Sequence, residues 1–219
     1  MNKTKFCFFV FLLVTGMCNV DAQNPARFKD QIEQLTIKDY QFNPDNKLVV
    51  FAGSSSIRMW KDVQDYFPDF NVINNGFGGS QFSDLIFYTD QLILKPKPEI
   101  LFIYEGDNDI ASGKKPSSIA KEAKYLLQNI QGELPETEII LISVKPSIAR
   151  WTLKKNYEKL NKRLRRLAKR TDKVEYANVW DVMIDQKGNL YQDIFLDDGV
   201  HMNKKGYDLW SEEIKNFLR

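Results

Sequence analysis

Ile100-Leu101-Phe102-Ile103-Tyr104 is an uninterrupted apolar run, and Glu105-Gly106-Asp107-Asn108-Asp109 follows it directly. A run that is apolar at every position, rather than at alternate ones, indicates a strand covered on both faces, as in a parallel sheet. Open α/β sheets bind their ligands beyond the carboxyl ends of the strands. The polar residues after position 104 are therefore candidates for a functional site.

The same pattern recurs along the chain. Residues 48–51, 72–74 and 139–143 form further apolar runs, and 174–177 form a weaker one. Apolar stripes with helical spacing lie around and between them, at 28–35, 82–93, 119–130, 153–167 and 207–218. Pro116 marks a helix start, and Asn203 is expected to cap the last helix. This alternation predicts a three-layer αβα sandwich around a central parallel sheet of about five strands.

The first 22 residues have the layout of a secretory signal peptide. Lys3 and Lys5 precede an apolar run over 6–18, and Val20-Asp21-Ala22 offers small residues for cleavage. A helix needs about 20 residues to span a bilayer, and this run is shorter. We therefore expect export, to the periplasm or the exterior, after cleavage near Ala22. The alternatives are a buried N-terminal helix and, with less support, a lipid anchor at Cys18.

Composition limits what the remaining chain can do. Residues 23–219 are expected to form a single domain. The net charge of +2 gives no field that would favour nucleic acid as a partner. Both cysteines, Cys7 and Cys18, lie in the predicted signal, which leaves no thiol for a disulfide, for catalysis or for a metal. His201 is the only histidine, so a multi-histidine metal site is excluded, and we expect no cofactor.

Lysines and arginines dominate residues 154–173. Such a run could contact a membrane surface or a polyanion. The same residues carry an apolar stripe at helical spacing, so we interpret the charges as the solvated face of an amphipathic helix.

Other strand ends carry residues that suit acyl transfer. Gly53-Ser54-Ser55-Ser56 follows the first strand, and Asp198 and His201 precede the last helix. A serine at a strand-to-helix turn is a nucleophile when a histidine accepts its proton and a carboxylate orients the imidazole. The reaction also needs donors for an oxyanion, and the Gly79 N–H and the Asn108 amide are suitable.

These segments resemble the conserved blocks of the SGNH/GDSL hydrolase family, which is named for a serine, a glycine, an asparagine and a histidine. The matching stretches occur in family order and span most of the chain: 53–56, 76–79, 106–109 and 198–201. Residues 51–58 and 145–151 are similar to the platelet-activating-factor-acetylhydrolase-like branch. The resemblance implies a flavodoxin-like sandwich.

The resemblance also implies roles for individual residues. It implies a catalytic triad and an oxyanion hole, made of Ser55, Asp198 and His201 for the triad and the Ser55 N–H, Gly79 and Asn108 for the hole. Ser54 stands where the family motif has aspartate, a position outside the triad. Because three serines are consecutive, Ser54 and Ser56 remain rival nucleophiles.

Several residues near the strand ends have competing interpretations. Glu105, Asp107 and Asp109 could hold a cation, but carboxylates on one short loop are more often solvated or hydrogen-bonded to nearby backbone. Trp60 and Trp151 could flank an acyl or sugar pocket, but aromatic residues near strand ends usually belong to the core.

The sequence therefore predicts an exported serine ester hydrolase that acts on a small-molecule or carbohydrate ester. Membrane contact is expected only through the signal or a lipid anchor. A chain of this length leaves little for a lid or a long acyl tunnel, which favours short acyl groups such as acetyl. The alternatives are a lysophospholipase or thioesterase-type lipolytic acylhydrolase, and a non-catalytic surface-binding module on the same scaffold.

Overall fold

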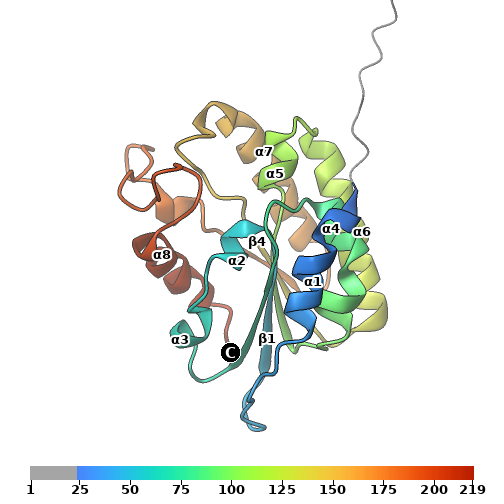
Figure 1. The fold of residues 1–219 in the computed structure, drawn as a ribbon. Helices are drawn as coiled ribbons and strands as arrows, with labels where there is room; N and C mark the ends of the chain where they lie inside the picture. The colour runs from blue at the N-terminus through green and yellow to red at the C-terminus, as the bar shows by residue number, and fades with distance from the viewer. Residues whose placement is uncertain (1–23) are drawn as a thin grey trace, which may run out of the picture.

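The computed structural model describes residues 24–219, so the predicted signal peptide lies outside the described residues. Five parallel strands form one sheet in the order β2-β1-β3-β4-β5 (Figure 1). They are β1 (Leu48–Gly53), β2 (Asn71–Gly76), β3 (Ile100–Tyr104), β4 (Glu138–Ile142) and β5 (Val174–Ala177). The predicted parallel sheet of about five strands is confirmed, and its strand order is that of flavodoxin-like doubly wound sheets.

Apolar side chains cover the sheet on both faces, which explains the continuous hydrophobicity of β1, β3 and β4. In β1, Val49 and Phe51 pack on one face and Val50 and Ala52 on the other, and all four are fully buried. Each face contributes to its own apolar cluster. The molecule therefore has two cores, separated by the sheet.

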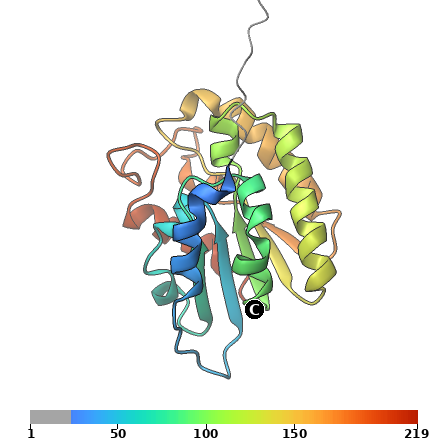
Figure 2. The ribbon, with the colours of Figure 1, turned by 45° about the vertical axis from the view of Figure 1, so that its right-hand side comes forward.

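Helices form the two outer layers (Figures 1 and 2). The first layer consists of η1 (Pro25–Phe28), α1 (Lys29–Thr36), α4 (Phe82–Phe87), η2 (Asp90–Leu94), α6 (Pro116–Glu133) and α7 (Lys154–Ala168). The second consists of α2 (Ser55–Arg58), α3 (Val63–Tyr66), η4 (Asp181–Met183) and α8 (Lys204–Lys215). The short elements α5 (Asp107–Ala111) and η3 (Trp151–Leu153) follow β3 and β4. The predicted three-layer sandwich is confirmed.

Local sequence explains two helix starts. Pro116 occupies the first position of α6, where its missing N–H costs no hydrogen bond. The side chain of Asn203 caps α8 by accepting a hydrogen bond from the N–H of Gly206, as predicted.

The single helix predicted over residues 82–93 is wrong, because the segment is divided. α4 ends at Phe87, and η2 is a separate turn of π-helix. Between them, the Thr89 hydroxyl lies 2.9 Å from the carbonyl oxygens of both Leu85 and Ile86. A threonine that bonds back to the preceding turn bends a helix, and apolar spacing does not reveal it.

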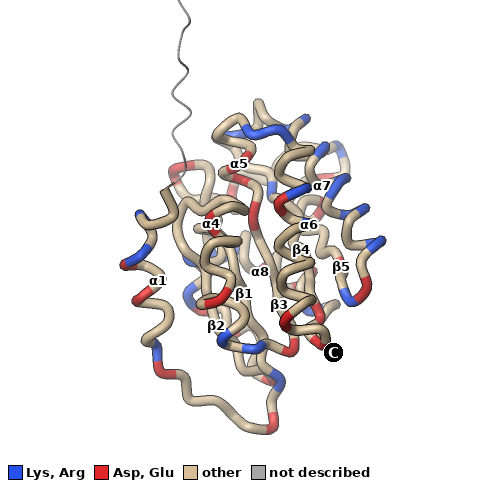
Figure 3. The backbone as a smooth tube through the Cα atoms, turned by 90° about the vertical axis from the view of Figure 1, so that its right-hand side faces the viewer, with Lys and Arg blue, Asp and Glu red and all other residues tan. Residues whose placement is uncertain are grey.

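The basic run of the sequence forms α7 and the turn after it (Figure 3). Tyr157, Leu160 and Leu164 are buried, whereas most of the lysines and arginines are exposed. This is the amphipathic arrangement that we favoured. Within residues 24–219, none of the helices combines the length and apolarity that a membrane span requires.

The carboxyl ends of β1 and β3 meet at the centre of the sheet. Gly53 ends β1 with a φ of +138°, and a Cβ at this position would lie 2.0 Å from the carbonyl oxygen of Tyr104. Only glycine allows the chain to turn so close to β3. After β1 the chain crosses one face of the sheet, and after β3 it crosses the other. Folds of this kind bind ligands at the point where two neighbouring strands diverge in this way.

Candidate active site

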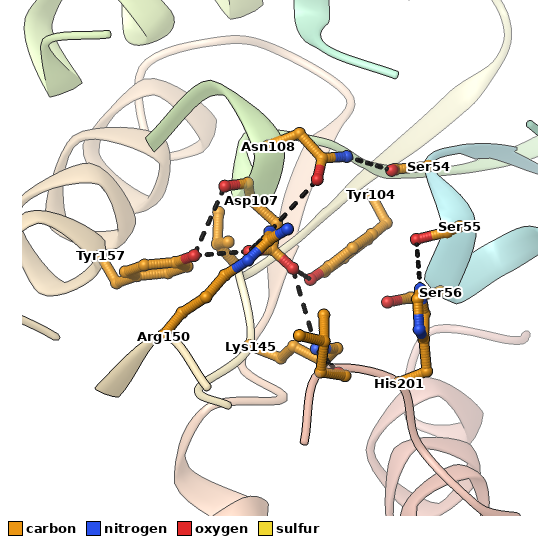
Figure 4. Close-up of polar contacts among 12 residues, drawn as sticks. Ser54, Ser55, Ser56, Tyr104, Asp107, Asn108, Lys145, Arg150, Tyr157 and His201 are labelled. Carbon is orange, nitrogen blue, oxygen red and sulfur yellow. Dashed lines mark hydrogen bonds and ion pairs between the residues drawn. The ribbon is translucent and has the colours of Figure 1, made fainter. Parts of the chain in front are cut away.

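Ser55 and His201 lie in contact although 146 positions separate them in the sequence. Ser55 is the first residue of α2, and its Oγ lies 2.9 Å from the Nε2 of His201. On the other side of the imidazole, Nδ1 lies 2.5 Å from Asp198 Oδ2. Figure 4 shows the serine pointing at the ring. The structure thus brings together the three residues that the resemblance implied as a triad.

A tight loop fixes Asp198 beside the imidazole. Its Oδ1 accepts hydrogen bonds from the backbone N–H groups of Val200 and His201, both at 2.9 Å. The carbonyl of Val200 in turn accepts from the ammonium of Lys145 at 2.5 Å. Lys145 follows β4 in the sequence and is fully buried, so this bond anchors the loop to the interior of the molecule.

Asp198 is ionised over the ordinary pH range. Burial acts to raise its pKa, but hydrogen bonds from the His201 side chain and from the N–H groups of His201 and Val200 lower it to about 2. An ionised carboxylate can only accept, so the Nδ1 of a neutral His201 carries the hydrogen. Nε2 is then the acceptor that faces Ser55, which is the tautomer that a general base needs.

The three consecutive serines have different surroundings. Ser55 is partly exposed and contacts His201. Ser54 is buried, and its hydroxyl accepts a hydrogen bond from the side chain of Asn108 at 2.8 Å. Ser56 is buried as well. The geometry therefore favours Ser55 over its two neighbours as a nucleophile.

Asn108, in the first turn of α5, borders the same cavity as Ser55. Its Nδ2 donates to the hydroxyl of Ser54 at 2.8 Å and to the carbonyl of Ser80 at 2.9 Å. Both amide hydrogens are thus engaged in this state, one of them by a neutral hydroxyl next to Ser55. Gly79 is exposed and borders the cavity too. The predicted oxyanion-hole residues are therefore gathered around Ser55.

Behind Asn108 lies a buried ionic network centred on Asp107 (Figure 4). The Nη1 of Arg150 donates to Asp107 at 2.6 Å and to the Oδ1 of Asn108 at 3.2 Å. The Tyr157 hydroxyl donates to the same carboxylate at 2.5 Å, and the Lys145 ammonium lies 3.8 Å away. Burial acts to raise the pKa of Asp107, but the charges of Lys145 and Arg150 hold it below its usual range. The network fixes which end of the Asn108 amide presents donors.

The carboxylates that follow β3, Glu105, Asp107 and Asp109, are buried, so the expectation that they are solvated is wrong. The other expectation, hydrogen bonds to nearby backbone, holds for two of them: Glu105 accepts from the Gly106 N–H and Asp109 from the Phe82 N–H. Glu105 accepts from the Ser80 hydroxyl at 2.5 Å, and burial raises the pKa of Glu105 well above its usual value. Burial also raises the pKa of Asp109 to about 6, although Lys114 lies 2.7 Å from it. Residues 24–219 contain no cluster of three His, Cys, Asp or Glu side chains that could hold a metal ion.

The site opens into a cavity of about 590 Å³. Its wall consists of Gln31, Ser55, Arg58, Gly78, Gly79, Asn108, Arg150 and His201. Gln31 was not predicted; it projects from α1 and accepts a hydrogen bond from the Gly78 N–H at 3.0 Å. Arg27, one turn earlier, lies 3.3 Å from the buried carboxylate of Asp84 and holds this part of the chain in place. These contacts join segments far apart in the sequence, so no local pattern signals them.

The two tryptophans near the strand ends have different positions. Trp60 is fully buried and belongs to the core, as the structural interpretation expected. Trp151 is partly buried and borders a second cavity, of about 240 Å³, together with Ile148, Asn189, Leu190 and Gln192.

A comparison with models of protein families finds one match. The model of the GDSL-like lipase/acylhydrolase family matches residues 48–209, which is most of the chain. A comparison with curated proteins gives no significant match.

Solved structures share the fold. One from Streptococcus pneumonia, provisionally described as a platelet activating factor, has a TM-score of 0.76 at 22% identity, covering 89% of this chain and 92% of that one. A GDSL-like lipase from Bacteroides thetaiotaomicron has a TM-score of 0.69 at 21% identity, covering 89% and 97%. A catalytic mutant of an acetylxylan esterase from Geobacillus stearothermophilus has a TM-score of 0.64 at 14% identity, covering 78% and 93%.

Proposed function

Because this chain belongs to the GDSL-like lipase/acylhydrolase family, we propose that it is a serine carboxylic ester hydrolase that works through an acyl-enzyme. The observation that carries the proposal is the 2.9 Å contact between Ser55 Oγ and His201 Nε2, with Asp198 on the opposite ring nitrogen. His201 is the only histidine of the chain, so no second imidazole is available as the base.

The proposed reaction has two halves. Ser55 Oγ attacks the ester carbonyl carbon while His201 takes its proton, and His201 then gives that proton to the leaving alcohol as the C–O bond breaks. Water next attacks the acyl-serine, with the same base taking its proton and returning it to Ser55 as the carboxylic acid leaves. Asp198 stabilises the imidazolium in both halves.

In this proposal the N–H groups of Ser55 and Gly79 and the amide of Asn108 stabilise the oxyanion. In the resting state, one amide hydrogen of Asn108 is donated to the neutral hydroxyl of Ser54. Hydrogen bonds to a charged acceptor are about twice as strong as neutral ones. The developing oxyanion therefore competes with Ser54 for this hydrogen, while Arg150 keeps the amide in the same orientation.

A solved relative supports the roles of Asp198 and His201. Catalytic mutants of the acetylxylan esterase replace either a histidine or an aspartate three positions before it, and Asp198 precedes His201 by the same interval. An acetyl esterase with this fold was solved with a serine replaced and with an acetate ion bound.

Short acyl groups on carbohydrate or small-molecule esters are the proposed substrates. None of the residues that line the 590 Å³ cavity has a large apolar side chain, which favours a short acyl group over a long alkyl chain. The second cavity combines Trp151 and Leu190 with the amides of Asn189 and Gln192. Apolar and hydrogen-bonding groups together suit a sugar ring. The signal-like first 22 residues support export as the place of action.

A fluorophosphonate probe tests the central proposal, because it labels activated serines. We expect the purified protein to be labelled and Ser55→Ala to stay unlabelled. A wild-type protein that resists the probe would favour the alternative of a non-catalytic binding module.

Rates on p-nitrophenyl esters with acyl chains of increasing length test the substrate. The fastest rate is expected on acetate. An optimum at medium or long chains would favour the lipolytic alternative.

A further inference from the structure

The cavity beside Ser55 has a positively charged wall. Arg58 and Arg150 both line it, and none of the other described lining residues is acidic. Asp198, the carboxylate of the proposed triad, contacts Nδ1 of His201, the ring nitrogen that faces away from Ser55. A substrate in this cavity therefore meets guanidinium groups and no carboxylate.

Arg58 is placed in the wall by a specific backbone contact. It follows Ser55 by three positions in α2, so both side chains leave the same side of this short helix. Its guanidinium lies against Gly78: a Cβ at position 78 would come within 2.8 Å of Arg58 Nε and 3.2 Å of Cζ. The backbone N–H of Gly78 donates a hydrogen bond to the side chain of Gln31. The missing side chain at position 78 is what lets the guanidinium lie there.

The two arginines differ in how their charges are balanced. Arg150 is paired with the buried carboxylate of Asp107 at 2.6 Å. Within residues 24–219, no carboxylate lies within ion-pair distance of Arg58. A guanidinium is a planar fork of donors that matches a carboxylate or phosphate with two parallel hydrogen bonds. Arg58 thus offers an unneutralised anion-binding group in the wall of the site.

We propose that Arg58 binds an acidic group, a carboxylate, phosphate or sulfate, on the alcohol part of the ester. The inference rests on the proposed function and narrows its substrate class to short acyl esters of acidic alcohols, such as sugar acids or sugar phosphates. Because the acyl group is short, the acidic group belongs to the alcohol. Arg150 is the less suitable group, since its charge is paired with Asp107 and its Nη1 is already bonded to Asp107 and Asn108.

The assignment leaves the bond chemistry unchanged. Ser55 forms the acyl bond, the C–O bond of the ester breaks, and His201 gives its proton to the acidic alcohol as it leaves. Arg58 takes part in no proton transfer. Its effect is confined to binding esters that carry the negative charge.

Two acetate esters with the same aryl acetate frame, one charged and one neutral on the leaving group, test the proposal. 4-Acetoxybenzoate carries a carboxylate on its alcohol part, and methyl 4-acetoxybenzoate is neutral. The ratio of their kcat/KM values is measured for the wild type and for Arg58→Gln, so that their difference in intrinsic reactivity cancels. We expect the ratio to fall about tenfold in the variant, which corresponds to about 1.4 kcal/mol. In the wild type the ratio should shrink as salt is added.

Lys61→Gln is the matched control. Lys61 carries the same charge three positions after Arg58, is exposed and does not border the cavity. Its ratio should equal that of the wild type; a fall as large as in Arg58→Gln would overturn the proposal in favour of a general field. Arg58→Lys keeps the charge without the fork and should retain part of the preference.

Other outcomes also contradict the proposal. An equal loss on both esters, in a variant with unchanged thermal unfolding, would mean that Arg58 acts on the oxyanion. Arg58 could instead affect only the preference for p-nitrophenyl hemisuccinate, which is charged on its acyl part, over p-nitrophenyl butyrate, which is neutral. That result would mean that Arg58 binds an acidic group on the acyl part of the ester. Failure of the proposed function gives a different result, because then neither ester is hydrolysed in a way that depends on Ser55.

Discussion

Asp107 accepts a 2.6 Å hydrogen bond from Arg150, and the same guanidinium nitrogen donates to the side-chain oxygen of Asn108. A buried carboxylate thus fixes a cation, and the cation fixes an amide that borders the cavity. An amide can present either its oxygen or its nitrogen to a site, and this bond decides between the two. Arg150 is therefore a positioning residue in the proposed mechanism.

Arg150→Ala should lower kcat by about 10- to 100-fold with a smaller change in KM. Asn108 loses the partner of its oxygen, and removing an oxyanion donor altogether typically costs 100- to 1,000-fold. Steady-state kinetics on p-nitrophenyl acetate measure the effect. Arg150→Lys is the control, because it keeps the charge for Asp107 but lacks the planar fork. An unchanged kcat in a folded Arg150→Ala protein would contradict this role.

The serine run allows a direct comparison of three neighbours. Ser55→Ala should lose activity by several orders of magnitude, because the contact with His201 is lost. Ser54→Ala and Ser56→Ala should stay within about tenfold of the wild type, since neither hydroxyl contacts the imidazole. Kinetics and fluorophosphonate labelling of the three purified variants measure this. Labelling that survives in Ser55→Ala would assign the nucleophile elsewhere.

Lys145→Met should weaken the loop that carries Asp198 and His201. The partly buried carbonyl of Val200 then loses its donor inside the protein, and a hydrogen bond from a charged group contributes about 1.5–3 kcal/mol. Asp107 keeps Arg150 and Tyr157. We expect the free energy of unfolding in urea to fall by that amount and kcat to fall with it. Full stability and full kcat would show that the bond holds nothing in place.

Asp109 should make stability depend on pH. Burial raises its pKa to about 6 in the folded protein, against about 4 in the unfolded chain. Between these values the folded protein binds a proton that the unfolded chain has lost. The free energy of unfolding therefore decreases as pH rises from 4 to 6, by on the order of 3 kcal/mol from this group.

Asp109→Asn removes the titrating carboxyl while keeping its shape. Urea unfolding of both proteins at several pH values between 4 and 7 measures its contribution together with its coupling to Glu105, whose pKa the charge of Asp109 raises. We expect the variant to show a flatter pH dependence. Parallel curves for the two proteins would refute the assignment.

The strands could be predicted from their apolar residues: β1, β3 and β4 are apolar at nearly every position, as burial on both faces requires, whereas β2 is apolar only at Val72 and Ile73 and β5 carries Glu175. Their order could not, since it depends on pairings between distant segments. Asp198 and His201 could be paired in advance because three positions separate them. Arg150 and Asp107 are 43 positions apart, and the sequence near either one gives no sign of the other. The division of the helix after Phe87 escaped prediction because it coincides with hydrogen bonds from the Thr89 hydroxyl to the preceding turn, which apolar spacing does not reveal.

Helix α1 precedes residue 48, where the match to the family model begins, yet its Gln31 forms part of the wall of the cavity. The groups proposed to break the ester all lie within the residues that the family model matches, whereas Gln31, which forms part of the cavity wall, lies outside them. Chemistry and choice of substrate are thus partly carried by different stretches of chain. A change in α1 can alter what the protein accepts while the contact between Ser55 and His201 stays as it is.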